Sequence, residues 1–138
     1  YKKKLIRLIE QHRLNNQIKL IEHCKDMALA YKVSDIIVSA SIEPEAFGRV
    51  AVEAQSMEKL IIASNIGGSN ETIVDGKTGI LFESGDVKSL SKKIIQAITM
   101  DESSIQLIGK EGRKNIIKKF NVEKMCFSTY SEYKRLLN

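Results

Sequence analysis

Apolar and polar residues follow two periods along this chain, one typical of helices and one typical of strands. Residues 2–13 place apolar positions among charges at helical spacing, which predicts a helix. Residues 18–22 alternate between apolar and polar side chains and therefore predict a strand. Two short apolar runs, at 35–40 and 60–64, are typical of strands buried on both faces of a sheet.

Helices and turns are predicted between and after these strands. Asp26 is placed to cap a short helix that runs through Tyr31, and residues 48–57 predict a second helix. Further on, a helical turn near Glu71 and a strand at 80–82 are expected, each next to glycines that break the chain.

The rest of the chain reads as helical. A segment from Ser84 or Asp86 to Met100 carries its apolar side chains on one face, and two further helices follow it. The apolar positions of the first segment are Val87, Leu90, Ile94, Ile95 and Ile98, and the two further helices span 102–119 and 122–137.

Strands that alternate with helices predict an α/β fold, in which a parallel, Rossmann-like sheet carries helices on both faces. In such sheets the ligand lies beyond the carboxyl ends of the strands. The strand at 35–40 leads into residues 41–48, which in turn begin a helix. We therefore expect the chemistry of this protein at residues 41–48.

Length and composition fit one globular domain that covers residues 1–138. The hydrophobic fraction is 43% and the charged fraction 28%, and no apolar run approaches the roughly 20 residues that a bilayer crossing needs. Cys24 and Cys126 lie far apart and have no partners at metal-ligand spacing, so we expect two reduced thiols and no metal site. The chain begins with Tyr1 rather than Met, which suggests a fragment.

The formal net charge is +5, with basic residues concentrated near both ends of the chain. An anionic membrane surface or a small anionic ligand suits this surplus, and so do solvated helix faces that bind nothing. Nucleic acid is not expected as a partner, because aromatic residues are few and no nucleic-acid-binding motif is present.

Residues 45–53 combine an anion site with two carboxylates. Gly48 allows an oxygen-rich ligand close to the backbone, and the N–H groups of Gly48, Arg49 and Val50 at the helix start favour a diphosphate. A carboxylate repels a phosphate, so Glu53 is better suited to accept hydrogen bonds from ribose hydroxyls.

Two neighbours complete this stretch. Glu45 lies in the loop before the helix and can accept hydrogen bonds from a hexose, while Phe47 is expected to pack beneath the turn and fix it. The same residues also fit a capped helix with surface glutamates, and residue chemistry leaves both interpretations open.

Glu45 and Glu53, separated by seven residues and with Phe-Gly between them, resemble the E-x7-E signature of the family 4 (group 1) retaining glycosyltransferases. Four further blocks resemble the same family in the same order: Asp35-Ile-Ile-Val-Ser-Ala-Ser41, Ile61-Ile-Ala-Ser64 with Gly67-Gly68-x-x-Glu71, Val74-Asp-Gly-x-Thr78-Gly-Ile-Leu81, and Gly85-Asp86. The resemblance runs from about residue 15 to residue 138. It implies the C-terminal, donor-binding half of a GT-B fold.

The resemblance assigns roles to individual residues. Glu45 would hold the transferred sugar and be the catalytic position, and Glu53 would hold the ribose. Gly48, Arg49 and Val50 would bind the diphosphate.

Further positions would border the same donor site. Gly67 and Gly68 would line the pocket together with Phe47, whereas His23 and Cys24 would lie near the nucleobase, an assignment that rests on position alone.

The family also implies a reaction. A hexose would pass from a UDP- or GDP-sugar donor to a lipopolysaccharide or other cell-envelope glycan, with retained configuration and no metal or cofactor. Such an enzyme would be cytoplasmic, with peripheral association at the inner face of the membrane as one possibility. Glu58 and Leu60 depart from the family pattern at positions away from the ligand side, and Ala40 stands where the family often has Pro before Ser41.

The resemblance further implies that an N-terminal, acceptor-binding domain and two strands of this domain are missing. We therefore expect a fragment that is inactive by itself and that self-associates or is unstable. A non-catalytic nucleotide-sugar-binding module and the remnant of a split gene are the alternatives.

Overall fold

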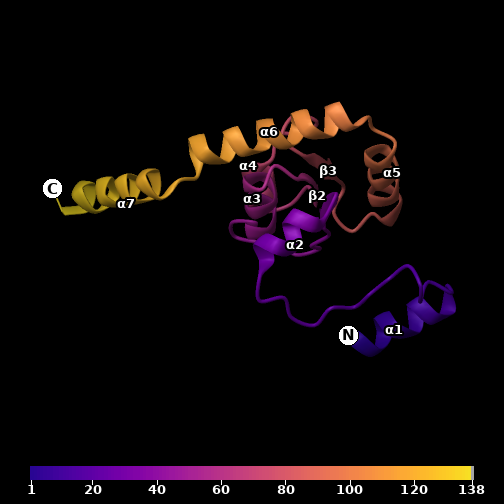
Figure 1. Ribbon diagram of the computed structural model, residues 1–138. Helices are drawn as coiled ribbons and strands as arrows, with labels where there is room; N and C mark the ends of the chain where they lie inside the picture. The colour runs from indigo at the N-terminus through magenta and orange to yellow at the C-terminus, as the bar shows by residue number, and fades with distance from the viewer. Residues whose placement is uncertain (138) are drawn as a thin grey trace.

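A parallel three-stranded sheet forms the centre of the computed structural model, which describes residues 1–137 (Figure 1). Its strands are β1 (Ile36–Ser39), β2 (Leu60–Ser64) and β3 (Ile80–Phe82), in the order β1-β2-β3. Ile37 pairs with Ile61 across the first interface, and Ile62 pairs with Ile80 across the second. The predicted α/β fold class is therefore confirmed.

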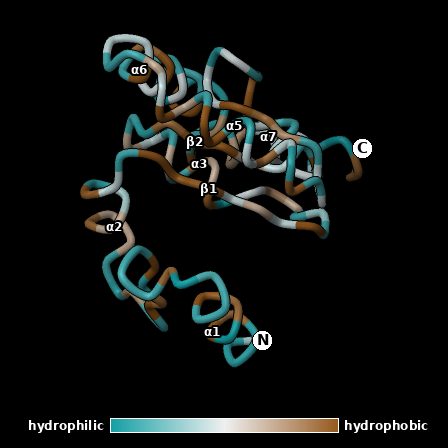
Figure 2. The backbone as a smooth tube through the Cα atoms, turned by 90° about the vertical axis from the view of Figure 1, so that its right-hand side faces the viewer, coloured by the Kyte–Doolittle hydropathy of each residue, from teal (hydrophilic) through white to brown (hydrophobic). Residues whose placement is uncertain are grey.

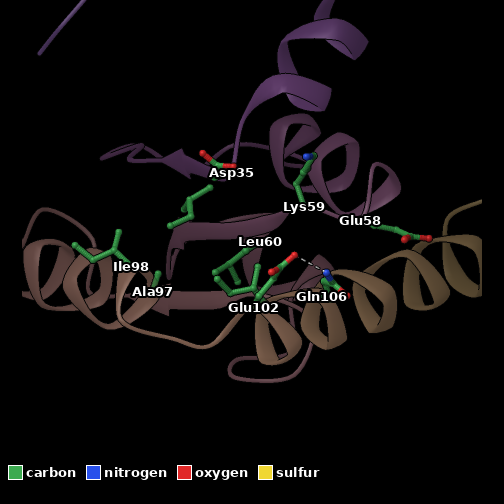
Figure 3. Close-up of a pocket in the computed structure, with 10 residues that line it drawn as sticks. Asp35, Glu58, Lys59, Leu60, Ala97, Ile98, Glu102 and Gln106 are labelled. Atoms are coloured by element: carbon green, nitrogen blue, oxygen red, sulfur yellow. Dashed lines mark hydrogen bonds between the residues drawn. The ribbon is translucent and has the colours of Figure 1, made fainter.

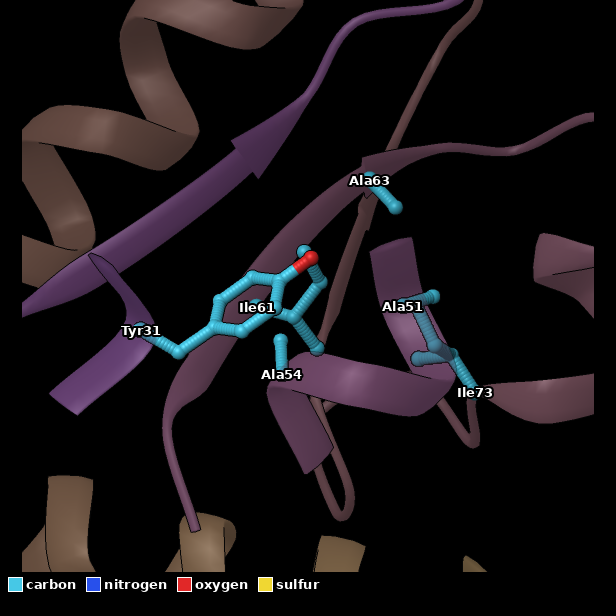
Figure 4. Close-up of a cluster of buried hydrophobic side chains, with 6 residues drawn as sticks. All are labelled: Tyr31, Ala51, Ala54, Ile61, Ala63 and Ile73. Carbon is cyan, nitrogen blue, oxygen red and sulfur yellow. The ribbon is translucent and has the colours of Figure 1, made fainter. Parts of the chain in front are cut away.

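Helices cover both faces of this sheet. On one face, α2 (Met27–Val33) and α3 (Arg49–Ser56) bury the cluster shown in Figure 4, and α4 (Ser69–Thr72) lies against α3. On the other face, α5 (Val87–Ile98) and α6 (Glu102–Lys119) cover a second cluster. The middle strand β2 supplies side chains to both clusters, and every residue in it is buried, as the sequence predicted.

Three of these helices begin at an aspartate that accepts hydrogen bonds from backbone N–H groups. Asp26 accepts from Leu29 N at 2.9 Å and so confirms the predicted start of α2. Asp86 and Asp101 cap α5 and α6 in the same way. These short polar side chains satisfy N–H groups that the first helical turn leaves without partners.

The predicted strand at 18–22 is wrong. Helix α1 (Lys2–Gln11) and the irregular segment that follows it lie apart from the sheet in two perpendicular views (Figures 1 and 2). Alternation of side chains is not sufficient for a strand, because each strand needs a neighbour whose N–H and C=O groups it can pair with. No strand among residues 1–137 lies beside this segment.

Burial in β1 and α5 is also lower than predicted. Val38 in β1 is 42% exposed, because β1 forms the edge of the sheet. In α5, Leu90 and Ile94 pack against the core, whereas Val87, Ile95 and Ile98 are 79%, 56% and 65% exposed. Only part of the apolar face of α5 therefore packs against the sheet.

Helix α7 (Val122–Leu137) extends from the end of α6 away from the sheet (Figure 1). Each of its described side chains is exposed, as expected for apolar residues without a partner. Exposure ranges from 62% to 85% for Met125, Phe127, Tyr130, Tyr133, Leu136 and Leu137. Self-association of the chain remains a prediction.

Candidate functional site

Two loops meet beyond the carboxyl ends of β1 and β2, where a ligand site was predicted. The N–H of Gly68 donates a hydrogen bond to the carbonyl of Glu45 at 2.8 Å. A Cβ on Gly67 would lie 2.6 Å from the carbonyl oxygen of Glu45, and a Cβ on Gly68 would lie 2.3 Å from the carbonyl carbon of Phe47. The structure therefore brings the glycine pair against the glutamate loop, and only glycines allow this approach.

Helix α3 begins at this contact with backbone N–H groups directed out of the helix. Gly48 adopts a left-handed conformation (φ 70°, ψ 55°) as the N-cap, and the N–H of Ala51 donates to its carbonyl at 3.0 Å. Among residues 1–137, none accepts a hydrogen bond from the N–H of Gly48, Arg49 or Val50. Such groups at a helix start can bind an anion.

Glu53 lies one turn into α3, and its two carboxylate oxygens have different partners. The hydroxyl of Tyr31 donates to Oε2 at 2.9 Å. Arg49 donates to Oε1 from Nε at 3.2 Å and from Nη2 at 2.9 Å. The Arg49 side chain is therefore turned along its own helix toward Glu53.

Tyr31 is almost completely buried, with 4% of its surface exposed. Burial, followed by the hydrogen bond to Glu53 and the negative charge of that residue, raises the pKa of its phenol from 10.0 to about 12, against a smaller lowering by Arg49. The hydroxyl is therefore a neutral donor at every physiological pH.

Glu45 is half-buried and is held by a serine from its own loop. The Ser41 hydroxyl donates to Glu45 Oε1 at 2.5 Å, and the Ser84 hydroxyl donates to the carbonyl of Ser41 at 3.2 Å. The carboxyl ends of all three strands thus contribute to the placement of Glu45, because Ser84 follows β3 and the glycine pair follows β2.

The sequence predicted that Phe47 packs beneath the turn, and this prediction is wrong. Its side chain is 44% exposed, and its ring packs edge to face on Phe120 with 5.6 Å between the ring centroids. The C-terminal end of α6 passes close to the glutamate loop and offers this partner. The backbone of Phe47, rather than its ring, contacts the glycine loop.

His23 and Cys24 are exposed in the segment that precedes α2, and the thiol of Cys24 lies 3.1 Å from the carbonyl of Asp26. A role for them near a nucleobase remains a prediction. Residues 1–137 contain no group of three His, Cys, Asp or Glu side chains placed to hold a metal ion. Within the same residues, every helix falls short of the length and apolar character required to cross a bilayer.

A separate hollow of about 490 Å³ lies at the opposite, amino end of the strands (Figure 3). Its lining includes the residues that begin β1 and β2, together with the end of α5 and the start of α6. None of the predicted site residues lines it. Because ligands of parallel sheets bind at the carboxyl ends, the loops around Glu45 remain the better candidate.

Sequence reasoning missed Tyr31 and Ser41, which donate to the two glutamates, and Ser84, which donates to the carbonyl of Ser41. Tyr31 was noted only as the end of a helix, and 22 positions separate it from Glu53. A signal was available for Ser41, which stands at the start of the same loop and is a residue type that donates to a nearby carboxylate.

The chain is similar in sequence to known proteins over most of its length. The family model described as "Glycosyl transferases group 1" matches residues 1–125. The capsular polysaccharide biosynthesis glycosyltransferase CapM of Staphylococcus aureus is 35% identical over 123 residues, which cover 89% of this chain and 32% of that protein. The chain thus spans about a third of the length of the curated relatives it matches.

Solved structures agree with this match. A glycosyltransferase of Rickettsia africae superposes with a TM-score of 0.93 at 36% identity, over 99% of this chain and 36% of that one. The Anabaena protein Alr3699/HepE, solved in complex with UDP-glucose, superposes with a TM-score of 0.88 at 26% identity, over 96% of this chain and 37% of that one. These neighbours are GT-B glycosyltransferases, and the chain matches their C-terminal part.

Proposed function

Because the chain belongs to the group 1 glycosyl transferases, we propose that it is the donor-binding part of a retaining glycosyltransferase. The donor is a nucleotide-diphosphate hexose such as a UDP- or GDP-hexose. The acceptor is a lipopolysaccharide or another cell-envelope glycan. The capsular polysaccharide relative and the neighbour crystallised with UDP-glucose support these two choices.

One observation carries the proposal: two glutamates flank a row of backbone N–H groups that lack an acceptor within residues 1–137. The N–H groups of Gly48, Arg49 and Val50 bind the diphosphate, since the start of α3 adds the positive end of the helix dipole. Glu53 accepts from the ribose hydroxyls, and Glu45 accepts from the hydroxyls of the hexose.

The order of these groups along α3 matches the order of groups in the donor. Glu45 precedes the N–H row in the chain, and Glu53 follows it by one helical turn. A diphosphate that occupies the N–H row therefore has its sugar on one side and its ribose on the other. The two carboxylates are kept away from the phosphates, which they would repel.

Charge that develops on the leaving diphosphate is stabilised by fixed dipoles in this arrangement. The N–H groups at the start of α3 are already oriented before the bond breaks, so they gain strength as negative charge grows on the leaving oxygen. Arg49 adds a cationic side chain when it leaves Glu53. The ion pair between these two residues is largely exposed, and its loss costs little.

We further propose that residues 1–138 hold the donor but do not transfer its sugar alone. A transfer site needs an acceptor surface opposite the donor, and the described residues provide one side of a cleft. The chain by itself would then act as a nucleotide-sugar-binding module, which is also the second candidate function.

Calorimetry with UDP, GDP and their hexose conjugates tests the proposal. We expect heat of binding with at least one nucleotide, and Glu53→Ala should weaken its affinity by about tenfold or more, because a hydrogen bond to a charged group is lost. Glu43→Ala removes an exposed carboxylate from the same loop and serves as the control. Absence of binding to every nucleotide would refute the proposal.

A further inference from the structure

Tyr31 connects the hydrophobic core to the candidate site. Its ring lies in the cluster formed by Ala51, Ala54 and Ile61, between α2 and the sheet (Figure 4). Only its hydroxyl reaches a polar partner, and that partner is Glu53 Oε2, at 2.9 Å. A ring that is 4% exposed has little room to move, so the position of its hydroxyl is fixed by packing.

The two oxygens of Glu53 are therefore held with unequal firmness. Oε2 is bound by a hydroxyl that the core keeps in place. Oε1 is bound by Arg49, whose side chain is 82% exposed and can turn toward solvent. An exposed pair of this kind contributes little to stability, so a ligand displaces Arg49 more easily than it displaces Tyr31.

We propose that Tyr31 is a positioning residue for Glu53, and that it fixes the carboxylate so that Oε1 receives the ribose hydroxyls of the donor. This inference rests on the proposed function, since it takes Glu53 as the ribose contact. Without the hydroxyl, the Glu53 side chain would sample several rotamers in the free protein. Binding of the donor would then have to select one of them, and the lost side-chain entropy would lower the affinity.

Packing alone would not require a tyrosine at this place. A phenylalanine fills the same space among Ala51, Ala54 and Ile61 and has no polar group to bury. Packing therefore explains the ring of Tyr31 but not its hydroxyl. Tyr31→Phe removes the hydroxyl and keeps the ring. That substitution separates positioning from packing.

The test compares wild-type protein, Tyr31→Phe and Tyr130→Phe by calorimetry with UDP, GDP and their 2′,3′-dideoxy analogues. Tyr130 is 63% exposed on α7 and provides the matched loss of a hydroxyl. We expect Tyr31→Phe to lose about tenfold in affinity for the ribonucleotide that binds, and to bind its dideoxy analogue like the wild type. Tyr130→Phe should change neither affinity.

A purely structural role predicts a different result, in which both affinities fall together or neither changes. An unaltered ratio of ribonucleotide to dideoxynucleotide affinity in Tyr31→Phe would overturn the positioning role. A wild type that binds both forms equally would instead overturn the ribose role of Glu53, on which the proposed function depends. The two failures are therefore distinguishable.

A second measurement needs no nucleotide. Urea unfolding of Tyr31→Phe, Glu53→Gln and the double variant forms a cycle that isolates the contact between the two side chains. We expect the unfolding constant of the double variant to depart from additivity by about fivefold. Additive effects would overturn the positioning role whatever the binding data show.

Discussion

The contact between the glycine pair and the glutamate loop can be tested with one added methyl group. Gly68→Ala would place a Cβ 2.3 Å from the carbonyl carbon of Phe47, 2.6 Å from its oxygen and 2.7 Å from its Cα. Ordinary carbon contacts lie at about 3.5–4.0 Å, so one of the two backbones must move by more than about 1 Å. No flexible side chain can absorb this movement.

Three effects set the size of the change in stability. Overpacking in a tight region costs about 1–3 kcal/mol, and loss of the 2.8 Å hydrogen bond from Gly68 N to Glu45 adds about 1 kcal/mol. Gly68 has an ordinary right-handed conformation (φ −59°, ψ −19°), so alanine gains up to about 1 kcal/mol because it lowers the conformational entropy of the unfolded chain. These terms sum to a net destabilisation of about 1–4 kcal/mol, with its centre at about 2–3 kcal/mol.

Gly85→Ala is the matched control, because a Cβ there meets nothing within 4 Å. Its φ of 78° makes alanine strained, and we expect a cost of about 1 kcal/mol from conformation alone. Urea unfolding measures both variants, and nucleotide calorimetry shows whether the site has moved. If Gly68→Ala were no more destabilising than Gly85→Ala and bound nucleotide equally well, the close approach of the two loops would be refuted.

Three other predictions follow from the core, from Tyr31 and from α7. Ile61→Ala should lower the free energy of unfolding in urea by about 2–5 kcal/mol, because Ile61 is fully buried in the central strand. A decrease below about 1 kcal/mol would contradict this burial. The folded pKa of Tyr31 is about 12, above its ordinary 10.0, so the free energy of unfolding is unaffected by this group below pH 10 and falls as pH rises from 10 toward 12. Between pH 8 and pH 11.5, the free energy of unfolding in urea should therefore fall more for wild type than for Tyr31→Phe. Equal falls in the two proteins would argue against the raised pKa. Sedimentation should show self-association that increases with concentration and that Leu136→Lys weakens, whereas a monomer at every concentration would speak against a role for the exposed α7 face.

Local signals in the sequence predicted the elements that depend on local interactions. Asp26 and Asp86 are short polar residues directly before apolar periodic segments, and both cap helices in the structure. The uninterrupted apolar run at 60–64 forms the fully buried central strand. In each case neighbouring residues determine the outcome, so the pattern of the chain is sufficient.

Predictions failed where the result depended on residues far away in the chain. The segment 18–22 has the side-chain pattern of a strand but lies beside no strand within residues 1–137. Phe47 turned toward Phe120, which no local signal indicates. The hydrogen bond from Tyr31 to Glu53 depends on how α2 and α3 pack, and periodicity says nothing about that.

The order of the strands in the sheet has a consequence for synthesis on the ribosome. Strands β1, β2 and β3 pair in the order in which they leave the exit tunnel, and each pair is joined through a helix that lies between them in the chain. Among the strands of residues 1–137, none has to wait for a later one to insert beside it, so each unit can dock as soon as it emerges. Early docking limits the time during which the apolar strand β2 is open to wrong partners. In nascent chains β2 should therefore begin to gain protection from proteases before α6, which completes the cover of its second face, has been translated.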